Sequence, residues 1–127
     1  MKVKYRIITN NASAEAKYPR VTEFLETGAD GVLIRTRDCI HKGAKLLNHP
    51  LSGGVLPGVR PYISLVITDN DNDNSKAPDM VSLELIENAI RLFKKAPAGF
   101  IGYDENTLDD FKVIDLDLLD SAIVSIA

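Results

Sequence analysis

The sequence has little of several residue types, and each shortage excludes a class of protein. It contains one cysteine, two histidines and no tryptophan in 127 residues. A single cysteine, Cys39, forms no internal disulfide, and one cysteine with two histidines does not make a zinc-type ligand set. We therefore expect no bound metal and a chain suited to the reducing cytoplasm.

Long apolar runs, an excess of basic charge and nucleotide-binding glycine motifs are also missing. No stretch approaches the roughly 18 consecutive apolar residues of a membrane span. Fifteen Lys and Arg against 18 Asp and Glu give a net charge of −3, so neither membrane nor nucleic acid is an expected partner. Neither G-x-G-x-x-G nor G-x-x-x-x-G-K-[ST] occurs. The absence of both motifs argues against an ordinary nucleotide-binding enzyme, and we expect no cofactor.

What is present is the composition of an ordinary folded chain. Hydrophobic residues make up 45% and charged residues 26%, and a chain of this length predicts one domain. The charge is split, because residues 1–64 carry ten Lys or Arg and five Asp or Glu, whereas residues 65–127 carry five and thirteen. Opposite charges in the two halves are satisfied within one fold or between copies, so a homo-oligomer is one expectation.

Hydrophobic periodicity predicts strands that alternate with helices. Strands are expected over residues 5–9, 21–25, 45–49, 62–68 and 111–114, and an edge segment over residues 100–103. One helix is expected from Asp30, as its N-cap, to a stop at Gly43, and another from the cap Asp79 to before Pro97. Shorter helices are expected over residues 12–17 and 106–110, with a last helix from Asp115 or Asp117.

This alternation predicts an α/β fold: a single three-layer domain over residues 1–127, with a mainly parallel sheet and helices on both faces. The apolar strand 62–68 is expected to be central. Two similar segments, 7–11 and 66–70, suggest that two parallel strands end at one sheet edge. Ligands of open α/β sheets bind at such an edge, so we expect one crevice lined by Asn10, Asn11, His49, Ser52 and Thr68.

The segment after the expected strand 45–49 is the most unusual in the chain. His49 enters a Pro-Leu-Ser-Gly-Gly turn, where Ser52 and the amides of Gly53 and Gly54 could hold an anion in a backbone nest. The alternative is a purely structural turn, shaped by glycine and proline, to which His49 bonds. A serine-nucleophile interpretation is weak because no Gly-x-Ser-x-Gly elbow is present, and the catalytic residues, if any, are unknown.

Other polar groups have structural interpretations. Asp69 begins a loop similar to a calcium-binding EF-hand, but Asn74 replaces the required glycine and Met80 the bidentate glutamate, which favours a solvated loop. His41 falls in the last turn of a helix, where a cation complements the dipole. Cys39 lies on an apolar stripe and is expected to be an inert core residue.

Several ordered elements resemble one family. Ile40 to Gly43 reads Ile-His-Lys-Gly and His49 to Gly53 reads His-Pro-Leu-Ser-Gly, while residues 7–11 and 83–89 resemble the opening strand and long helix of that family. The chain is similar to the GrdX family, small proteins encoded with the glycine/sarcosine/betaine reductase complexes of amino-acid-fermenting anaerobes. The resemblance implies a cytoplasmic accessory protein of that system and no established reaction.

Two functions follow as hypotheses. The first is a non-catalytic accessory protein that binds a small anion or a protein partner, such as a reductase component, through residues 49–54. The second is a small enzyme acting on a phosphorylated or carboxylated metabolite, with His49 as acid–base and Ser52 with the glycine amides as anion cradle. Whether the protein is an enzyme is left open by the residues alone.

Overall fold

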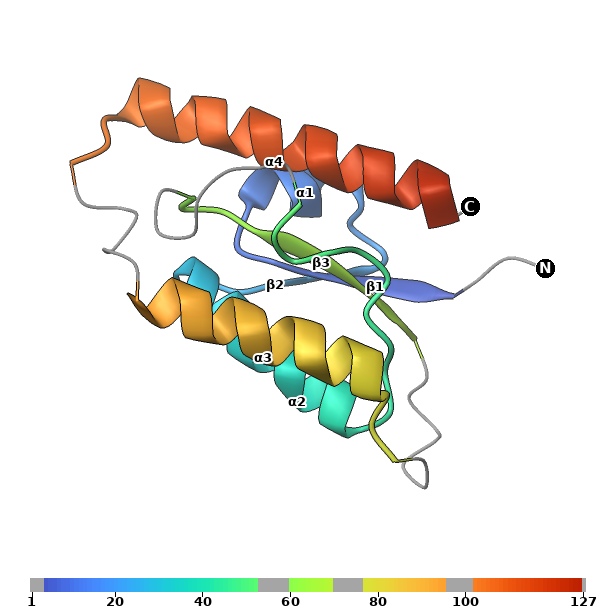
Figure 1. The fold of residues 1–127 in the computed structure, drawn as a ribbon. Helices are drawn as coiled ribbons and strands as arrows, with labels where there is room; N and C mark the ends of the chain where they lie inside the picture. The colour runs from blue at the N-terminus through green and yellow to red at the C-terminus, as the bar shows by residue number, and fades with distance from the viewer. Residues whose placement is uncertain (1–3, 53–59, 70–76, 96–101, 127) are drawn as a thin grey trace.

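The computed structural model describes residues 4–52, 60–69, 77–95 and 102–126, and the account that follows concerns these residues. They form a small three-stranded sheet with four helices (Figure 1). In chain order the elements are β1 (Tyr5–Thr9), α1 (Ala12–Lys17), β2 (Thr22–Phe24), α2 (Ala29–His41), β3 (Ser64–Thr68), α3 (Met80–Lys95) and α4 (Glu105–Ile126).

The sheet is mixed, with the strand order β2-β1-β3. β2 pairs parallel to β1, whereas β3 pairs antiparallel to it, with Tyr5 opposite Thr68 and Thr9 opposite Ser64. The expectation of a three-layer domain built on a mainly parallel sheet is not supported, because the sheet itself is mixed and small, although the α/β class is confirmed. The expectation of a central strand 62–68 is also wrong, because β1 occupies the centre and β3 is hydrogen-bonded to it on one side.

Helices cover both faces of this sheet: α2 and α3 lie on one face, and α1 and α4 on the other (Figure 1). Successive residues of a strand point to opposite faces. Accordingly, Ile8 and Leu65 belong to the core beneath α2 and α3, whereas Ile7 and Val66 belong to the core beneath α1 and α4. Because each face of β1 and β3 is buried, the apolar run of β3 does not alternate in polarity.

The helices on the first face begin and end largely as their sequences predict. Asp79 caps α3 by accepting the Ser82 amide at 3.0 Å, and Gly43 lies just beyond α2 with a positive φ of 109°, the backbone conformation that favours glycine after a helix. The N-cap of α2 differs from expectation, because the helix begins two residues earlier and Gly28 takes the cap position in place of Asp30.

The expected strand 45–49 does not form. Leu46 makes one isolated antiparallel bridge to Ile67, and Leu47 donates its amide to the Val66 carbonyl at 2.8 Å. The side chain of Asn48 then replaces the backbone: its Oδ1 accepts the Val66 amide at 2.8 Å and its Nδ2 donates to the Ser64 carbonyl at 3.1 Å. This extended segment satisfies the outer edge of β3 without becoming a strand.

The C-terminal quarter of the chain differs most from the sequence prediction. Residues expected to form a helix, the strand 111–114 and a second helix form the single helix α4, capped by Asp104, which accepts the Thr107 amide at 2.8 Å. The expected edge segment 100–103 lies partly outside the described residues. None of the helices described is long and apolar enough to cross a membrane.

Candidate functional site

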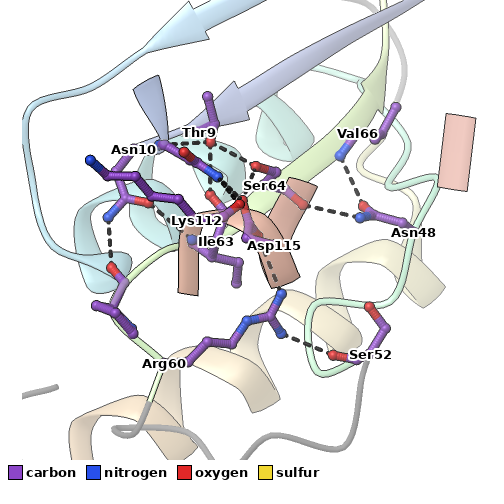
Figure 2. A network of polar contacts seen from close by, with 12 residues as sticks. Thr9, Asn10, Asn48, Ser52, Arg60, Ile63, Ser64, Val66, Lys112 and Asp115 are labelled. Carbon is purple, nitrogen blue, oxygen red and sulfur yellow. Dashed lines mark hydrogen bonds and ion pairs between the residues drawn. The ribbon is translucent and has the colours of Figure 1, made fainter. Parts of the chain in front are cut away.

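A cluster of buried polar side chains lies where β1 ends and β3 begins (Figure 2). We call it the Asp115 cluster, and its members are Thr9, Asn11, Arg60, Ser64 and Asp115, all at most 7% exposed. The members come from five parts of the chain, because the end of β1, the N-cap of α1, the segment before β3, the start of β3 and the middle of α4 meet here. The antiparallel pairing of Thr9 with Ser64 brings the two hydroxyl oxygens within 2.7 Å.

Asp115 accepts hydrogen bonds from three of these side chains. Its Oδ2 receives the Ser64 hydroxyl at 2.6 Å and Nδ2 of Asn11 at 3.0 Å, and its Oδ1 is 3.5 Å from Nη2 of Arg60. Burial lowers the pKa of Arg60, and the negative charge of Asp115 opposes that shift. A buried carboxylate with three donors, one of which is its ion-pair partner, is a satisfied structural group.

Asn10 and Asn11, both predicted as ligand residues, bond to the protein itself. Nδ2 of Asn10 donates to the carbonyls of Thr27 and Pro61 at 2.9 and 3.0 Å, and its Oδ1 accepts the Ile63 amide at 2.9 Å. Asn11 caps α1 by accepting the Ser13 amide at 3.0 Å. Each amide therefore fixes the segments around it.

His49 and Ser52 belong to a tight turn over residues 49–52, here called the His49 turn. Ser52 donates its amide to the His49 carbonyl at 3.1 Å, and the Ser52 carbonyl accepts Nη1 of Arg60 at 3.0 Å. The imidazole is exposed, and its Nδ1 accepts the Leu51 amide at 3.0 Å. In the neutral ring Nε2 then carries the proton. Gly53 and Gly54 lie outside the described residues.

Arg60 links the turn to the Asp115 cluster. One guanidinium nitrogen holds the Ser52 carbonyl and the other faces Asp115, as Figure 2 shows. On the other side of the turn, Asn48 is held by its two hydrogen bonds to β3. An exposed histidine is thus presented on a turn that buried polar groups secure at both ends.

Thr68 does not join these residues. Because β3 runs antiparallel to β1, its last residue lies beside Tyr5, at the opposite end of the sheet from Asn10. Its hydroxyl accepts the Lys45 amide at 2.8 Å. The expectation that two strands end in one crevice is therefore wrong in its premise, since it required parallel strands.

The sequence interpretation placed neither Asp115 nor Ser64 at this site. One sequence signal could have indicated Asp115: it lies four residues before Leu119, so the two share one face of a helix. The structure shows that this face is buried, since Leu119 is 1% exposed. A carboxylate on a buried stripe requires partners. Two of its partners, Ser64 and Arg60, lie 51 and 55 residues away along the chain. No local sequence pattern could therefore predict them.

Chemically, the described part of the site is a hydrogen-bonded scaffold that carries one exposed imidazole. Among the described residues there is no group of histidine, cysteine or acidic side chains that could hold a metal ion.

These features define a small α/β domain with a mixed sheet and a histidine turn fixed to a buried ion pair. A family model described as GrdX-like protein matches residues 6–124. The chain belongs to this GrdX-like family. Comparisons with curated proteins and with solved structures found no match.

Proposed function

We propose that this protein is a non-catalytic, cytoplasmic accessory protein of the glycine/sarcosine/betaine reductase system, and that it binds a component of that system through the His49 turn. Membership of the GrdX-like family supports the reductase context through the family name. The geometry of the turn supports binding as the mode of action, for the reasons that follow.

The observation that carries the proposal is the contrast between His49 and the residues around it. Asn10, Asn11, Arg60 and Asp115 are all buried and bonded to other parts of the chain, whereas His49 is exposed. A rigid support beneath an exposed ring reduces the conformational entropy lost on binding. Aromatic and polar groups held in this way are typical contacts of a protein interface.

The test is capture of the purified glycine reductase complex by the immobilised protein, by His49→Ala and by His41→Ala. His41, the other histidine, is also exposed and ends α2, so its variant is the matched control. We expect His49→Ala to reduce the captured reductase at least tenfold and His41→Ala to leave it unchanged. Failure of the wild-type protein to capture the reductase would reject the proposal, and equal capture by His49→Ala would reject the role of the turn.

A small anion is the second ligand class for the same turn, and the Nε2–H donor of His49 favours it. Arg60 is paired with Asp115 and Lys45 lies next to Thr68 at the far end of β3, so neither offers a free positive charge to an anion at the turn. Thermal unfolding with phosphate, acetate and acetyl phosphate tests this alternative. Saturation at 100 times the dissociation constant adds about 2.7 kcal/mol, a shift of a few degrees, and His49→Ala should abolish it.

The enzyme alternative assigns His49 as acid–base on a phosphorylated or carboxylated metabolite. An exposed imidazole is suited to proton transfer near neutral pH, but here its orientation depends on a backbone amide, that of Leu51, in place of the carboxylate that orients many catalytic histidines. Turnover of acetyl phosphate by the wild-type protein, lost in a folded His49→Ala variant, would establish this alternative over the binding proposal.

A further inference from the structure

α4 has more apolar surface than its neighbours cover. Its inner side packs on β3 and α1 through Leu119 and the residues around it. Its outer side still carries Val113, Ile114 and Val124, which are 60%, 45% and 78% exposed. Exposed apolar side chains that gather on one face of a helix are a common feature of interaction surfaces. The outer side therefore has the composition of an interface, and we call it the α4 outer face.

Acidic residues accompany these apolar side chains. Asp110 and Asp117 are exposed and fall on the same side as Val113, Ile114 and Val124, since residues three, four and seven apart share one helix face. The face is acidic at Asp110 and Asp117, and its second half carries the exposed Ser121 and Val124. A partner must therefore offer positive charge at one end of its contact and apolar surface at the other.

α3 has the reverse pattern on its outer side. Its first two residues, Met80 and Val81, are 64% and 68% exposed, and its last turns carry exposed Arg91, Lys94 and Lys95. We call this side the α3 outer face. A hollow of about 490 Å³ runs along it and is lined by Val81, Glu84, Leu85, Glu87, Asn88 and Arg91. Glu87 is already paired with Arg37 at 3.2 Å, which reduces the negative charge within the hollow.

The two faces match in length when the helices run antiparallel. Fourteen residues separate Asp110 from Val124, and fourteen separate Val81 from Lys95, about 21 Å in each helix at 1.5 Å per residue. Antiparallel alignment places Asp110 against Lys95 and Val124 against Val81. In the same register Asp117 meets Asn88, three residues before Arg91. Ile114 meets Arg91 and Ser121 meets Glu84, so charge and apolar surface correspond at the two ends of the contact.

We propose that a second copy of this chain is the partner of the α4 outer face, and that it docks there with its α3 outer face. Figure 1 shows why this is geometrically simple: α3 and α4 lie on opposite faces of the sheet and run in opposite directions. A copy stacked in the same orientation brings its α3 antiparallel to α4 of the first. Pairing α4 with α4 is less favourable, because an antiparallel pair centred on this face brings the two Asp117 side chains together.

This association is head-to-tail. Each copy uses one surface to bind and a different surface to be bound, so copies form a ring where the rotation closes and an open chain where it does not. A single helix-to-helix contact is smaller than a standard protein interface. The association is therefore weak and, because exposed charges steer it, falls with added salt.

The experiment is sedimentation equilibrium of the full chain over a concentration series at low and high salt. Three charge-reversal variants are compared with the wild type: Asp110→Lys with Asp117→Lys, Arg91→Glu with Lys95→Glu, and all four changes together. All four residues are exposed, so each variant should keep the fold, and circular dichroism checks this. We expect each double variant to weaken association at least tenfold and the fourfold variant to restore it.

The outcomes separate the possible arrangements. Loss with both double variants and recovery with the fourfold variant supports head-to-tail docking. Loss with the Asp110/Asp117 variant alone means that α4 meets α4 and overturns the proposal. A wild-type protein that stays monomeric at millimolar concentration in low salt, or one whose association the variants do not change, also overturns it. None of these readings involves the reductase, so they are independent of the function of the His49 turn.

Discussion

At the scale of single residues, the fold buries one pair of opposite charges among the described residues. Asp115 and Arg60 are 2% and 7% exposed and face each other across 3.5 Å. A buried ion pair adds little stability over apolar residues of the same volume, but removal of one partner leaves the other charge without compensation. The pair therefore fixes how α4, β3 and the His49 turn meet.

Asp115→Ala should lower the free energy of unfolding by about 3–5 kcal/mol, because Arg60 then remains buried without its partner. Urea unfolding followed by circular dichroism measures the effect. The matched control is Asp117→Ala on the same helix, an exposed residue whose change should stay within about 0.5 kcal/mol. Similar losses in both variants would contradict a special role for Asp115.

Glu23 is a second residue whose charge is used in the folded state. It accepts Nε and Nη2 of Arg35 at 2.6 and 3.0 Å, and these hydrogen bonds hold its pKa below the usual 4.5, against the opposing effect of burial. The pKa of Glu23 is lower in the folded than in the unfolded protein. Ionised Glu23 therefore stabilises the fold fully above its unfolded pKa, and this stabilisation is lost as the pH falls through its folded pKa.

Glu23→Gln should therefore cost about 1 kcal/mol near neutral pH, as a partly exposed ion pair does. The difference from wild type should shrink as the pH falls from about 5 to about 3. Urea unfolding at a series of pH values measures it, and Glu26→Gln, at an exposed position three residues further along the chain, is the control. A difference that grows toward low pH would contradict the assignment.

At the scale of elements, α4 shows how tertiary contacts override local pattern. Phe111 to Ile114 has the β-branched and aromatic composition of a strand, yet it continues a helix. The residues on either side explain this. Asp104, before the segment, caps α4, and Asp115 and Leu119, after the segment, are buried against the sheet. Asp115 and Leu119 are four residues apart, so a helix places both of them on the face that contacts the sheet.

A proline at position 113 distinguishes the two interpretations of this segment. Val113→Pro removes a backbone hydrogen bond within α4 and should cost at least about 3 kcal/mol, with a loss of helical circular dichroism. Glu105→Pro is the control, because Glu105 is the first residue of α4 and proline is tolerated there. Equal tolerance of both prolines would mean that residue 113 is not inside a helix.

At the scale of the whole molecule, one small sheet supports two cores. Leu33 belongs to the core under α2 and α3, and Leu119 to the core under α1 and α4, and both are at most 1% exposed. The strands β1 and β3 contribute side chains to both cores, so neither core persists when the sheet is lost. The described helices and strands should unfold together.

Leu33→Ala and Leu119→Ala should each lower the free energy of unfolding by about 2–5 kcal/mol within a single cooperative transition. Because the sheet separates the two residues, the double variant should show the sum of the two effects within about 0.5 kcal/mol. Thermal unfolding followed by far-ultraviolet circular dichroism and by tyrosine fluorescence measures both. Separate transitions in the two signals would mean that the cores are independent.

The sequence alone determined the elements whose signals are local. β2, α2 and α3 follow from hydrophobic periodicity, β1 and β3 from β-prone apolar runs, and α1 forms over the residues expected for it. Gly43 and Asp79 act at helix ends as expected. These signals are local because helix and strand periods, and the caps that end helices, involve residues a few positions apart. The family also followed from contiguous motifs, and the match over residues 6–124 confirms it.

Only the tertiary structure decided how these elements combine. It set β3 antiparallel to β1, placed β1 at the centre, merged the last segments into α4 and brought Asp115 to Ser64 and Arg60. Strand direction and order depend on contacts between residues far apart in the chain, and buried polar partners depend on which elements meet. The same physics separated Thr68 from Asn10, since an antiparallel strand ends where its neighbour begins.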